Sequence, residues 1–237
     1  PDKEVVFFAV GFETTAPANA LSVLHAKREG IKNYSILTSH VLVPPAIEAI
    51  VNDQTNIVQG FLAAGHVCTI MGIGDYYPLV EKNKLPIVIT GFEPVDLLQG
   101  ITMLIKQLEN GEHKLENQYS RVVKPEGNPE AVKVIEQVFE ITHRDWRGIG
   151  EIPYSGYEVR KELEAYNANV KFDIQLEKAE ESPDCIAGEI LRGIKKPNQC
   201  PQFGKRCTPL NPLGAPMVSS EGACAAYYHF SNVDVLV

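Results

Sequence analysis

Residues 4–17 read EVVFFAVGFETTAP, and this stretch decides the fold class of the chain. Residues 4–10 are almost all apolar and rich in β-branched and aromatic side chains, which is typical of a buried strand. Gly11 permits a tight turn, and Pro17 suits the start of a helix because its missing N–H has no intrahelical partner there. A buried strand that turns directly into a helix is the unit from which parallel α/β sheets are built.

The same unit recurs along the first 110 residues. Three further apolar runs predict strands, and a helical pattern follows each of the four runs. The additional strands are expected at residues 34–39, 67–72 and 85–90, and the helices at residues 16–30, 44–53, 75–83 and 93–111. Near-continuous apolar strands that alternate with helices indicate an α/β fold with a mainly parallel sheet and flanking helices.

The tripeptide Gly-Phe-Glu ends two of the predicted strands, once with Glu13 and once with Glu93. Parallel sheets usually bind ligands at this carboxyl edge, where helix N-termini begin. If both strands belong to one sheet, the two glutamates point to the same edge. Two interpretations stay open: these glutamates and Thr14 or Thr15 contact a ligand, or they cap the helices and complement the helix dipoles.

Length and charge exclude several classes of protein. The chain has 237 residues, 44% of them hydrophobic, which is enough to bury the core of a large domain or of a domain plus a smaller module. Its net charge of −8 argues against a non-specific nucleic-acid or membrane-surface binder, since both need a basic footprint. No secretory signal or bilayer-length apolar segment occurs, so we expect a cytoplasmic protein. A strand predicted so close to Pro1 suggests that a preceding part of a longer protein is missing.

The rest of the chain is more polar and is expected to form a second module. Residues 128–146 begin with Asn-Pro, a favoured helix start, and carry apolar residues at helical spacing. Residues 155–168 show a second helical pattern, and the glycine-rich segment 147–156 predicts a loop. We therefore expect an α/β domain over residues 1–145 and a small helical, loop-rich module over residues 146–237.

Four of the five cysteines lie in the last quarter of the chain, namely Cys185, Cys200, Cys207 and Cys224. In a chain expected to be cytoplasmic, clustered cysteines indicate a metal site more readily than disulfides. Their gaps are all wider than the short gaps between paired zinc ligands. Wide and uneven spacing favours an iron–sulfur cluster over zinc, because a four-iron cubane is larger than one ion and accepts thiolates from separate loops.

Local sequence around the cysteines agrees with this interpretation. Ser182 predicts a helix start that places Cys185 in the first turn, and residues 218–228 predict a helix that carries Cys224. Helix N-termini favour thiolates over thiols. Residues 190–220 contain no acidic residue, and two interpretations of their basic residues stay open, an offset for cluster charge or a solvated loop. These basic residues, which are also a candidate partner surface, are Arg192, Lys195, Lys196, Lys205 and Arg206.

Five segments follow one another along the chain in a distinctive order. They are GFETTAP (11–17), SHVLVPPAI (39–47), GHVCTIMG (65–72), GFEPVDLLQGI (91–101) and CPQFGKRCTPLNPLGAPMVSSEGACAAYY (200–228). Together with the cysteine spacing, they resemble the HypD family of nickel–iron hydrogenase maturation factors. The resemblance runs through nearly all of the chain and is more specific than a fold-level analogy.

The resemblance implies a redox-active scaffold on which the Fe(CN)2CO centre of nickel–iron hydrogenases is transiently assembled, and it leaves open whether the protein is an enzyme. The implied partners are a HypC-type chaperone and a HypE-type cyanide donor. A [4Fe–4S] cluster would supply electrons through a cysteine pair, and its implied ligands are Cys185, Cys200, Cys207 and Cys224. The residues implied to face the assembly cleft are Glu13, Thr14, Thr15, His66 and Glu93.

Two features depart from the family pattern. The family's Cys-Gly-Thr-His type motif and C-x-x-C pair, which hold the nascent iron and pass electrons, do not occur in this sequence. Cys68 stands where a small residue such as serine is expected, and we interpret it as a buried, inert thiol. Two alternative functions stay open: a stand-alone iron–sulfur oxidoreductase of a small molecule, and a structural zinc protein with four cysteine ligands.

Overall fold

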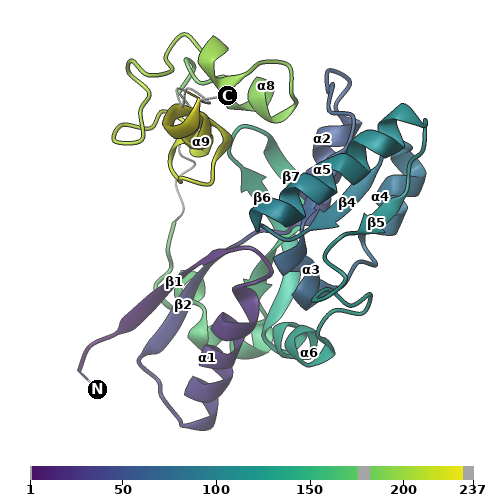
Figure 1. Cartoon of the computed structure of the whole chain (residues 1–237). Helices are drawn as coiled ribbons and strands as arrows, with labels where there is room; N and C mark the ends of the chain where they lie inside the picture. The colour runs from purple at the N-terminus through teal and green to yellow at the C-terminus, as the bar shows by residue number, and fades with distance from the viewer. Residues whose placement is uncertain (1, 176–181, 232–237) are drawn as a thin grey trace. The chain divides into compact units, whose positions relative to one another are not determined.

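The computed structural model describes residues 2–175 and 182–231 (Figure 1). The chain divides into two compact units, each assembled from separate segments. The first unit comprises Pro1–Ala46, Gln59–Arg144 and Pro153–Leu176. The second unit comprises Ile47–Val58, Asp145–Ile152 and Glu177–Val237. The four clustered cysteines all belong to the second unit.

The opening strand–helix–strand segment forms where the sequence predicts it, but the prediction of a buried first strand is wrong, because residues 5–8 and 10 are exposed. Strands β1 (Val5–Gly11) and β2 (Tyr34–His40) pair in parallel, and helix α1 (Ala16–Arg28) connects them. The side chains that α1 turns inward pack with residues of β1 and β2 in a core cluster that includes Ala9, Ala20, Val23 and Ile36. Pro17 lies in the first turn of α1, in keeping with its predicted position at a helix start.

A second parallel sheet contains strands β3 (Phe61–Ala64), β4 (Ile87–Thr90) and β5 (Leu115–Asn117) in that spatial order. Helix α4 (Tyr76–Asn83) precedes β4, and helix α5 (Pro94–Glu109) packs on β3 and β4 (Figure 1). The α/β fold with parallel strands is thereby confirmed. The expectation of one sheet is wrong for the described residues, because β1–β2 and β3–β4–β5 are separate sheets.

The third predicted strand is also wrong. Residues 67–72 lie mostly in helix α3 (Gly65–Met71), and the strand precedes it as the four-residue β3. Val67 and Cys68 face the interior from this helix. A short apolar run does not distinguish a strand from a buried helix by periodicity, which explains the error.

The segment between residues 128 and 175 is less helical than predicted. Helix α6 (Pro129–Val138) begins as expected, with the Asn128 side chain accepting a hydrogen bond from the Ala131 N–H at 3.1 Å. The chain then forms a two-stranded sheet of β6 (Phe139–Trp146) and β7 (Gly150–Val159) where helix and loop were predicted. A short 3₁₀ helix, η1 (Lys161–Tyr166), and helix α7 (Ala168–Lys171) follow.

Short elements separated by loops make up the part of the second unit that contains the cysteines, and of the four only Cys224 lies within one of these elements. They are α8 (Ala187–Leu191), the 3₁₀ helices η2 (Pro197–Gln199) and η3 (Ala215–Met217), and α9 (Ala223–Phe230). Helix α2 (Val43–Asn52) lies between β2 and β3 along the chain. Within the described parts of the chain, none of the helices combines the length and apolar character that crossing a bilayer requires.

Candidate metal centre and strand-end loops

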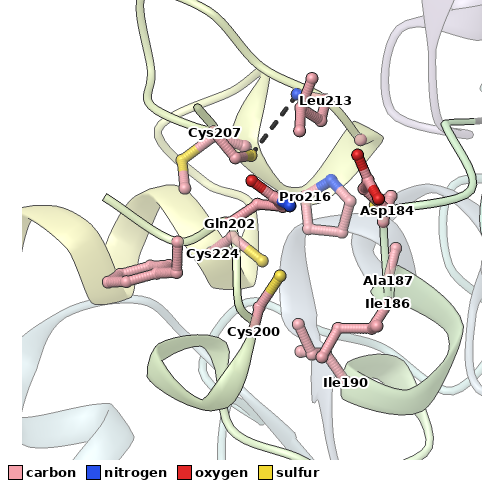
Figure 2. Close-up of a pocket in the computed structure, with 14 residues that line it drawn as sticks. Asp184, Ile186, Ala187, Ile190, Cys200, Gln202, Cys207, Leu213, Pro216 and Cys224 are labelled. Carbon is pink, nitrogen blue, oxygen red and sulfur yellow. Dashed lines mark hydrogen bonds between the residues drawn. The ribbon is translucent and has the colours of Figure 1, made fainter. Parts of the chain in front are cut away.

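All four clustered cysteines line one pocket of the second unit (Figure 2). Each comes from a different segment: Cys185 precedes α8, Cys200 follows η2, Cys207 lies between η2 and η3, and Cys224 lies in the first turn of α9. Figure 2 shows the sulfur atoms of Cys200 and Cys224 turned toward one another. Apolar side chains, among them Ile190, Phe203 and Met217, make up much of the remaining wall. The fold therefore brings together in one pocket four thiols that come from separate segments of the chain.

Cys185 and Cys224 differ in how their backbone is placed. Cys224 is the second residue of α9, which confirms its predicted position on a helix. The predicted helical position of Cys185 is wrong, because α8 begins only at Ala187. Cys185 instead lies in a turn in which its N–H donates to the Ser182 carbonyl oxygen at 2.9 Å. A helix dipole therefore does not explain how the Cys185 sulfur is held.

The pocket places the thiols in an environment that disfavours several negative charges at once. Burial raises the pKa of Cys224 to about 11, and the nearby thiols of Cys207, Cys185 and Cys200 act in the same direction. The Leu213 N–H donates to the Cys207 sulfur at 3.4 Å. Four thiolates in this pocket would need a bound cation, because metal coordination is what deprotonates clustered thiols.

Four thiols are a donor set that suits a four-iron cluster or a zinc ion, and the choice between them stays a prediction. A structural zinc ion takes four ligands, with sulfur at about 2.3 Å. An iron–sulfur cubane takes one cysteine per iron at the corners of a larger body, which suits thiols spread around a pocket.

The basic run that follows Cys185 is partly neutralised by acids from outside the run. Arg192 pairs with Asp53 at 2.9 Å, and Lys195 pairs with Glu189 at 2.8 Å. Arg206 pairs with Asp184 at 2.9 Å, which joins the residues next to Cys207 and Cys185. These groups are partly exposed, so each pair adds little stability. Offsetting a cluster is therefore not the only use of these positive charges.

In the first unit, Glu13 reaches across to the loop that follows the neighbouring strand. Its carboxylate is only 2% exposed and accepts a hydrogen bond from the Val43 N–H, at the start of α2, at 2.9 Å. The other carboxylate oxygen has no hydrogen-bond partner within the described residues. Burial raises the pKa of Glu13 to about 7, with Asp75 adding a smaller repulsion. Glu13 thus connects the loops that follow β1 and β2.

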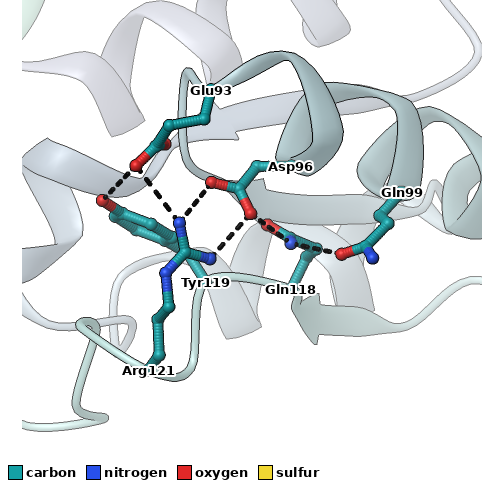
Figure 3. Close-up of polar contacts among 6 residues, drawn as sticks. All are labelled: Glu93, Asp96, Gln99, Gln118, Tyr119 and Arg121. Atoms are coloured by element: carbon teal, nitrogen blue, oxygen red, sulfur yellow. Dashed lines mark hydrogen bonds and ion pairs between the residues drawn. The ribbon is translucent and has the colours of Figure 1, made fainter.

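Glu93 makes the corresponding connection in the second sheet (Figure 3). It accepts a hydrogen bond from Arg121 at 3.2 Å, and the same guanidinium pairs with both oxygens of the buried Asp96. Arg121 also stacks over the Tyr119 ring at 4.5 Å. Its hydrogen bonds, followed by that of Gln118, hold the pKa of Asp96 well below the usual range. Glu93 thus connects the loop after β4 to the loop after β5.

Neither Gly-Phe-Glu motif caps its helix through a side chain. Thr15 is the N-cap residue of α1, but its hydroxyl donates to the Phe12 carbonyl oxygen at 3.1 Å. Glu93 is the N-cap residue of α5 and also makes no side-chain capping bond. The predicted N-cap position of Thr15 is thus confirmed without a side-chain capping bond, and a role of the two glutamates in complementing the helix dipoles stays a prediction. Thr14 is half-buried beside them, and a ligand-binding role for the loops stays a prediction.

His66 lies with the second motif rather than the first. Its exposed ring packs edge-on against Phe92 with 4.6 Å between ring centroids. His66 and Glu93 therefore belong to one loop group after β3 and β4, whereas Glu13, Thr14 and Thr15 follow β1 of the other sheet. Their shared role at an assembly cleft stays a prediction.

One buried residue, His40, gains an importance that its sequence position alone did not reveal. His40 is fully buried against Phe139 and Tyr157, and its Nε2 accepts a hydrogen bond from Asn19 at 2.9 Å. Burial, helped by Arg144, lowers the pKa of His40 to about 4. The alternation of inward side chains along β2 is the signal that would have found it.

Cys68 is fully buried, as predicted for an inert thiol. Burial raises its pKa to about 11. The nearby negative charge of Glu13 acts in the same direction. Cys68 belongs to the first unit, whereas the four pocket cysteines belong to the second.

The sequence matches one family of known proteins along nearly its whole length. Residues 1–231 match the model of a family described as "HypD: Hydrogenase formation hypA family". The chain is 44% identical to the hydrogenase maturation factor HypD2 of Bradyrhizobium diazoefficiens and 45% identical to the hydrogenase expression/formation protein HupD of Azotobacter chroococcum. It is also 44% identical to the hydrogenase maturation factor HypD of Rhodobacter capsulatus. Each match covers 98% of this chain and 63% of the relative, so the chain spans less than two thirds of their length.

Proposed function

This chain belongs to the HypD family of hydrogenase maturation factors, and we propose that it acts as a scaffold in the assembly of nickel–iron hydrogenases. In this proposal the Fe(CN)2CO centre is the cargo, a HypC-type chaperone is the partner, and a HypE-type protein donates cyanide. The cysteines that bind a [4Fe–4S] cluster are Cys185, Cys200, Cys207 and Cys224. We expect the protein to act in the cytoplasm, where thiols stay reduced.

The convergence of four cysteines on one pocket is the observation that carries the proposal. The four come from separate segments, yet all line the same largely apolar space in the second unit. The names of the relatives supply the process, since the HypD proteins among them are called hydrogenase maturation factors. The pocket supplies a chemical reason why such a factor would need this part of its chain.

When bound, a [4Fe–4S] cluster supplies one-electron transfer. The residues of the chain hold it and set its environment. Cysteine thiolates bind it, and the wall that includes Ile190, Phe203 and Met217 keeps water away. The Leu213 N–H, which donates to the Cys207 sulfur, offsets part of the negative charge there.

The loop group after β3 and β4 is the proposed site that meets the iron centre as cargo. His66 and Phe92 are exposed and lie against one another, and Glu93 is partly exposed beside them. Arg121 pairs with Glu93 and with Asp96, so it joins this loop to the loop after β5. The His66 imidazole and the Glu93 carboxylate provide polar groups that contact the cargo.

Metal analysis of the chain purified without oxygen tests the cluster. We expect about four irons and four acid-labile sulfides per chain and absorption near roughly 400 nm. Cys207→Ala removes a pocket thiol and is expected to abolish this content. Cys68→Ala is the matched control, because Cys68 belongs to the first unit, and is expected to leave it unchanged. One zinc and no sulfide per chain, obtained again from iron-replete cells, would contradict the proposal and support the structural zinc alternative.

A further inference from the structure

The dipeptide Leu213–Gly214 contacts two pocket cysteines that are distant in the chain. The Leu213 N–H donates to the sulfur of Cys207 at 3.4 Å. Gly214 lies directly against Cys185, because a Cβ atom built on Gly214 would overlap the Cys185 sulfur. The same added atom would come within 3.5 Å of the Cys185 Cβ. One short segment therefore borders both thiols.

Backbone conformation does not explain why position 214 is glycine. Gly214 has φ −145° and ψ 160°, an extended conformation that any residue adopts. An alanine there would be tolerated by the backbone itself. The constraint comes from the space that a side chain would take, and the Cys185 sulfur occupies that space.

Two further glycines pack closely against one another near Cys185. A Cβ on Gly188, at the start of α8, would come within 2.5 Å of the Gly148 carbonyl oxygen. Gly148 adopts φ +87°, a conformation that favours glycine. A second pocket, lined by Cys185, Gly148 and Gly214 among others, adjoins this contact. Packing of these segments, together with the turn at Ser182, therefore contributes to the position of the Cys185 sulfur.

We propose that Gly214 is a positioning residue that leaves the space in which the Cys185 sulfur is held for metal binding. The inference rests on the proposed function, because it assumes that Cys185 is a cluster ligand. The neighbouring Leu213 N–H donates a hydrogen bond to the Cys207 sulfur. The segment 213–214 therefore contacts two of the proposed ligands, Cys185 and Cys207. Any side chain at position 214 displaces the Cys185 sulfur or pushes the two segments apart.

Unfolding of the metal-free chain measures the contact between Gly214 and Cys185 independently of any cluster. We expect Gly214→Ala to lower the urea midpoint in the wild-type background. In a Cys185→Ala background the sulfur is gone, so the same substitution is expected to lower the midpoint much less. Gly74→Ala is the control, because a Cβ there meets no atom within 4 Å, and its effect is expected to be the same in both backgrounds.

Iron and sulfide uptake then measures the consequence for metal binding. We expect Gly214→Ala to weaken uptake about tenfold or more, as changes next to metal ligands usually do, and Gly74→Ala to leave it unchanged. Equal destabilisation by Gly214→Ala in both backgrounds, or failure of the Gly214→Ala/Cys185→Ala chain to fold, would overturn the inference. Wild-type uptake by Gly214→Ala would overturn it as well. If the wild-type chain itself takes up no iron and sulfide, the proposed function fails, and the midpoints still decide whether Gly214 makes room for the Cys185 sulfur.

Discussion

Glu13 accepts a hydrogen bond from the backbone N–H of Val43 at 2.9 Å, and this contact joins the loops that follow two adjacent parallel strands. Glu93 and Arg121 make the equivalent connection between the loops after β4 and β5. The repeated Gly-Phe-Glu sequence thus has a structural explanation. The strand ends at Gly11 in the first copy and at Thr90, directly before Gly91, in the second, and in each copy the glutamate binds the loop of the neighbouring strand.

Glu13 makes the stability of the first unit depend on pH. Burial raises its pKa from 4.5 to about 7, so the folded chain prefers the protonated form. Its contribution to stability is fully present below pH 4.5 and is lost as the pH rises through 7. We expect the wild-type chain to lose about 3 kcal/mol of unfolding free energy over this range relative to Glu13→Gln.

Urea unfolding between pH 4.5 and pH 8 measures this difference. The other titratable groups that interact with Glu13 are Asp75, Cys68, Tyr76 and Tyr157, and both chains retain them. Glutamine keeps an oxygen that accepts the Val43 hydrogen bond, so the comparison isolates the charge. Parallel pH profiles for the two chains would show that Glu13 does not titrate in this range.

His40 changes the unfolding free energy with pH in the direction opposite to Glu13. Burial lowers its pKa from 6.5 to about 4, so its contribution is present above pH 6.5 and is lost as the pH falls through 4. We expect His40→Gln to be closest to the wild type in unfolding free energy near pH 4 and furthest below it near pH 7. A difference that stays constant with pH would contradict the buried, neutral imidazole.

The titrations of Glu13 and His40 change the unfolding free energy in opposite directions between pH 4.5 and 6.5. The pH profile of the wild-type chain alone therefore hides both. The double variant Glu13→Gln/His40→Gln is therefore expected to show a flatter profile than either single variant. The two side chains lie in the same unit, and both interact with Tyr157. A steep profile in the double variant would assign the pH dependence to other groups.

Arg121 is expected to stabilise the loop group after β4 and β5. Its loss would leave the buried Asp96 carboxylate with only the Gln118 hydrogen bond named above. We expect Arg121→Ala to lower the unfolding free energy, because it removes two charge-assisted hydrogen bonds to the Asp96 carboxylate. Arg28→Ala is the control, since Arg28 pairs with Glu29 on the exposed surface and is expected to change stability by less than about 0.5 kcal/mol. Equal losses in the two variants would show that the network is not stabilising.

The Leu213 N–H is expected to tune the proposed cluster. A hydrogen bond to a ligand sulfur stabilises the more negative, reduced state and raises the reduction potential. Leu213→Pro removes the N–H, whereas Leu213→Ala keeps it and loses only side-chain contacts. We expect a more negative potential in the proline variant than in the alanine variant by redox titration. Identical potentials would show that this N–H does not contribute.

Sequence patterns predicted β1 and β2 because each is a seven-residue strand, and most of the helices because they are periodic. Strand β4 is as short as β3, but all four of its residues are β-branched, whereas Phe61–Ala64 contains no β-branched residue. Strand β6 was missed because its apolar residues continue the helical spacing of α6, and β7 because its glycines and proline predict a loop. Pairing with a neighbouring strand, which decides such cases, depends on contacts that a single segment does not encode.

The sequence predicted the four cysteines that line the pocket, but not the residues that surround them or the partners of the two glutamates. Clustered cysteines identify themselves by residue type, so their convergence on one pocket was foreseeable. The partners of Glu13 and Glu93 were not, because Val43 and Arg121 become neighbours only through strand order. The proposed role of Gly214 was not predictable either, because a glycine has no side-chain chemistry and its contact with Cys185 appears only in the fold.

Electron paramagnetic resonance of the anaerobically purified chain, before and after chemical reduction, tests the central claim most directly. A [4Fe–4S] cluster on the four cysteines predicts no signal as isolated and an iron–sulfur signal after reduction, which Cys207→Ala abolishes and Cys68→Ala retains. Zinc has no redox chemistry, so it gives no signal in either state. Absence of a signal after reduction, in a chain that contains one zinc and no sulfide, would contradict the account.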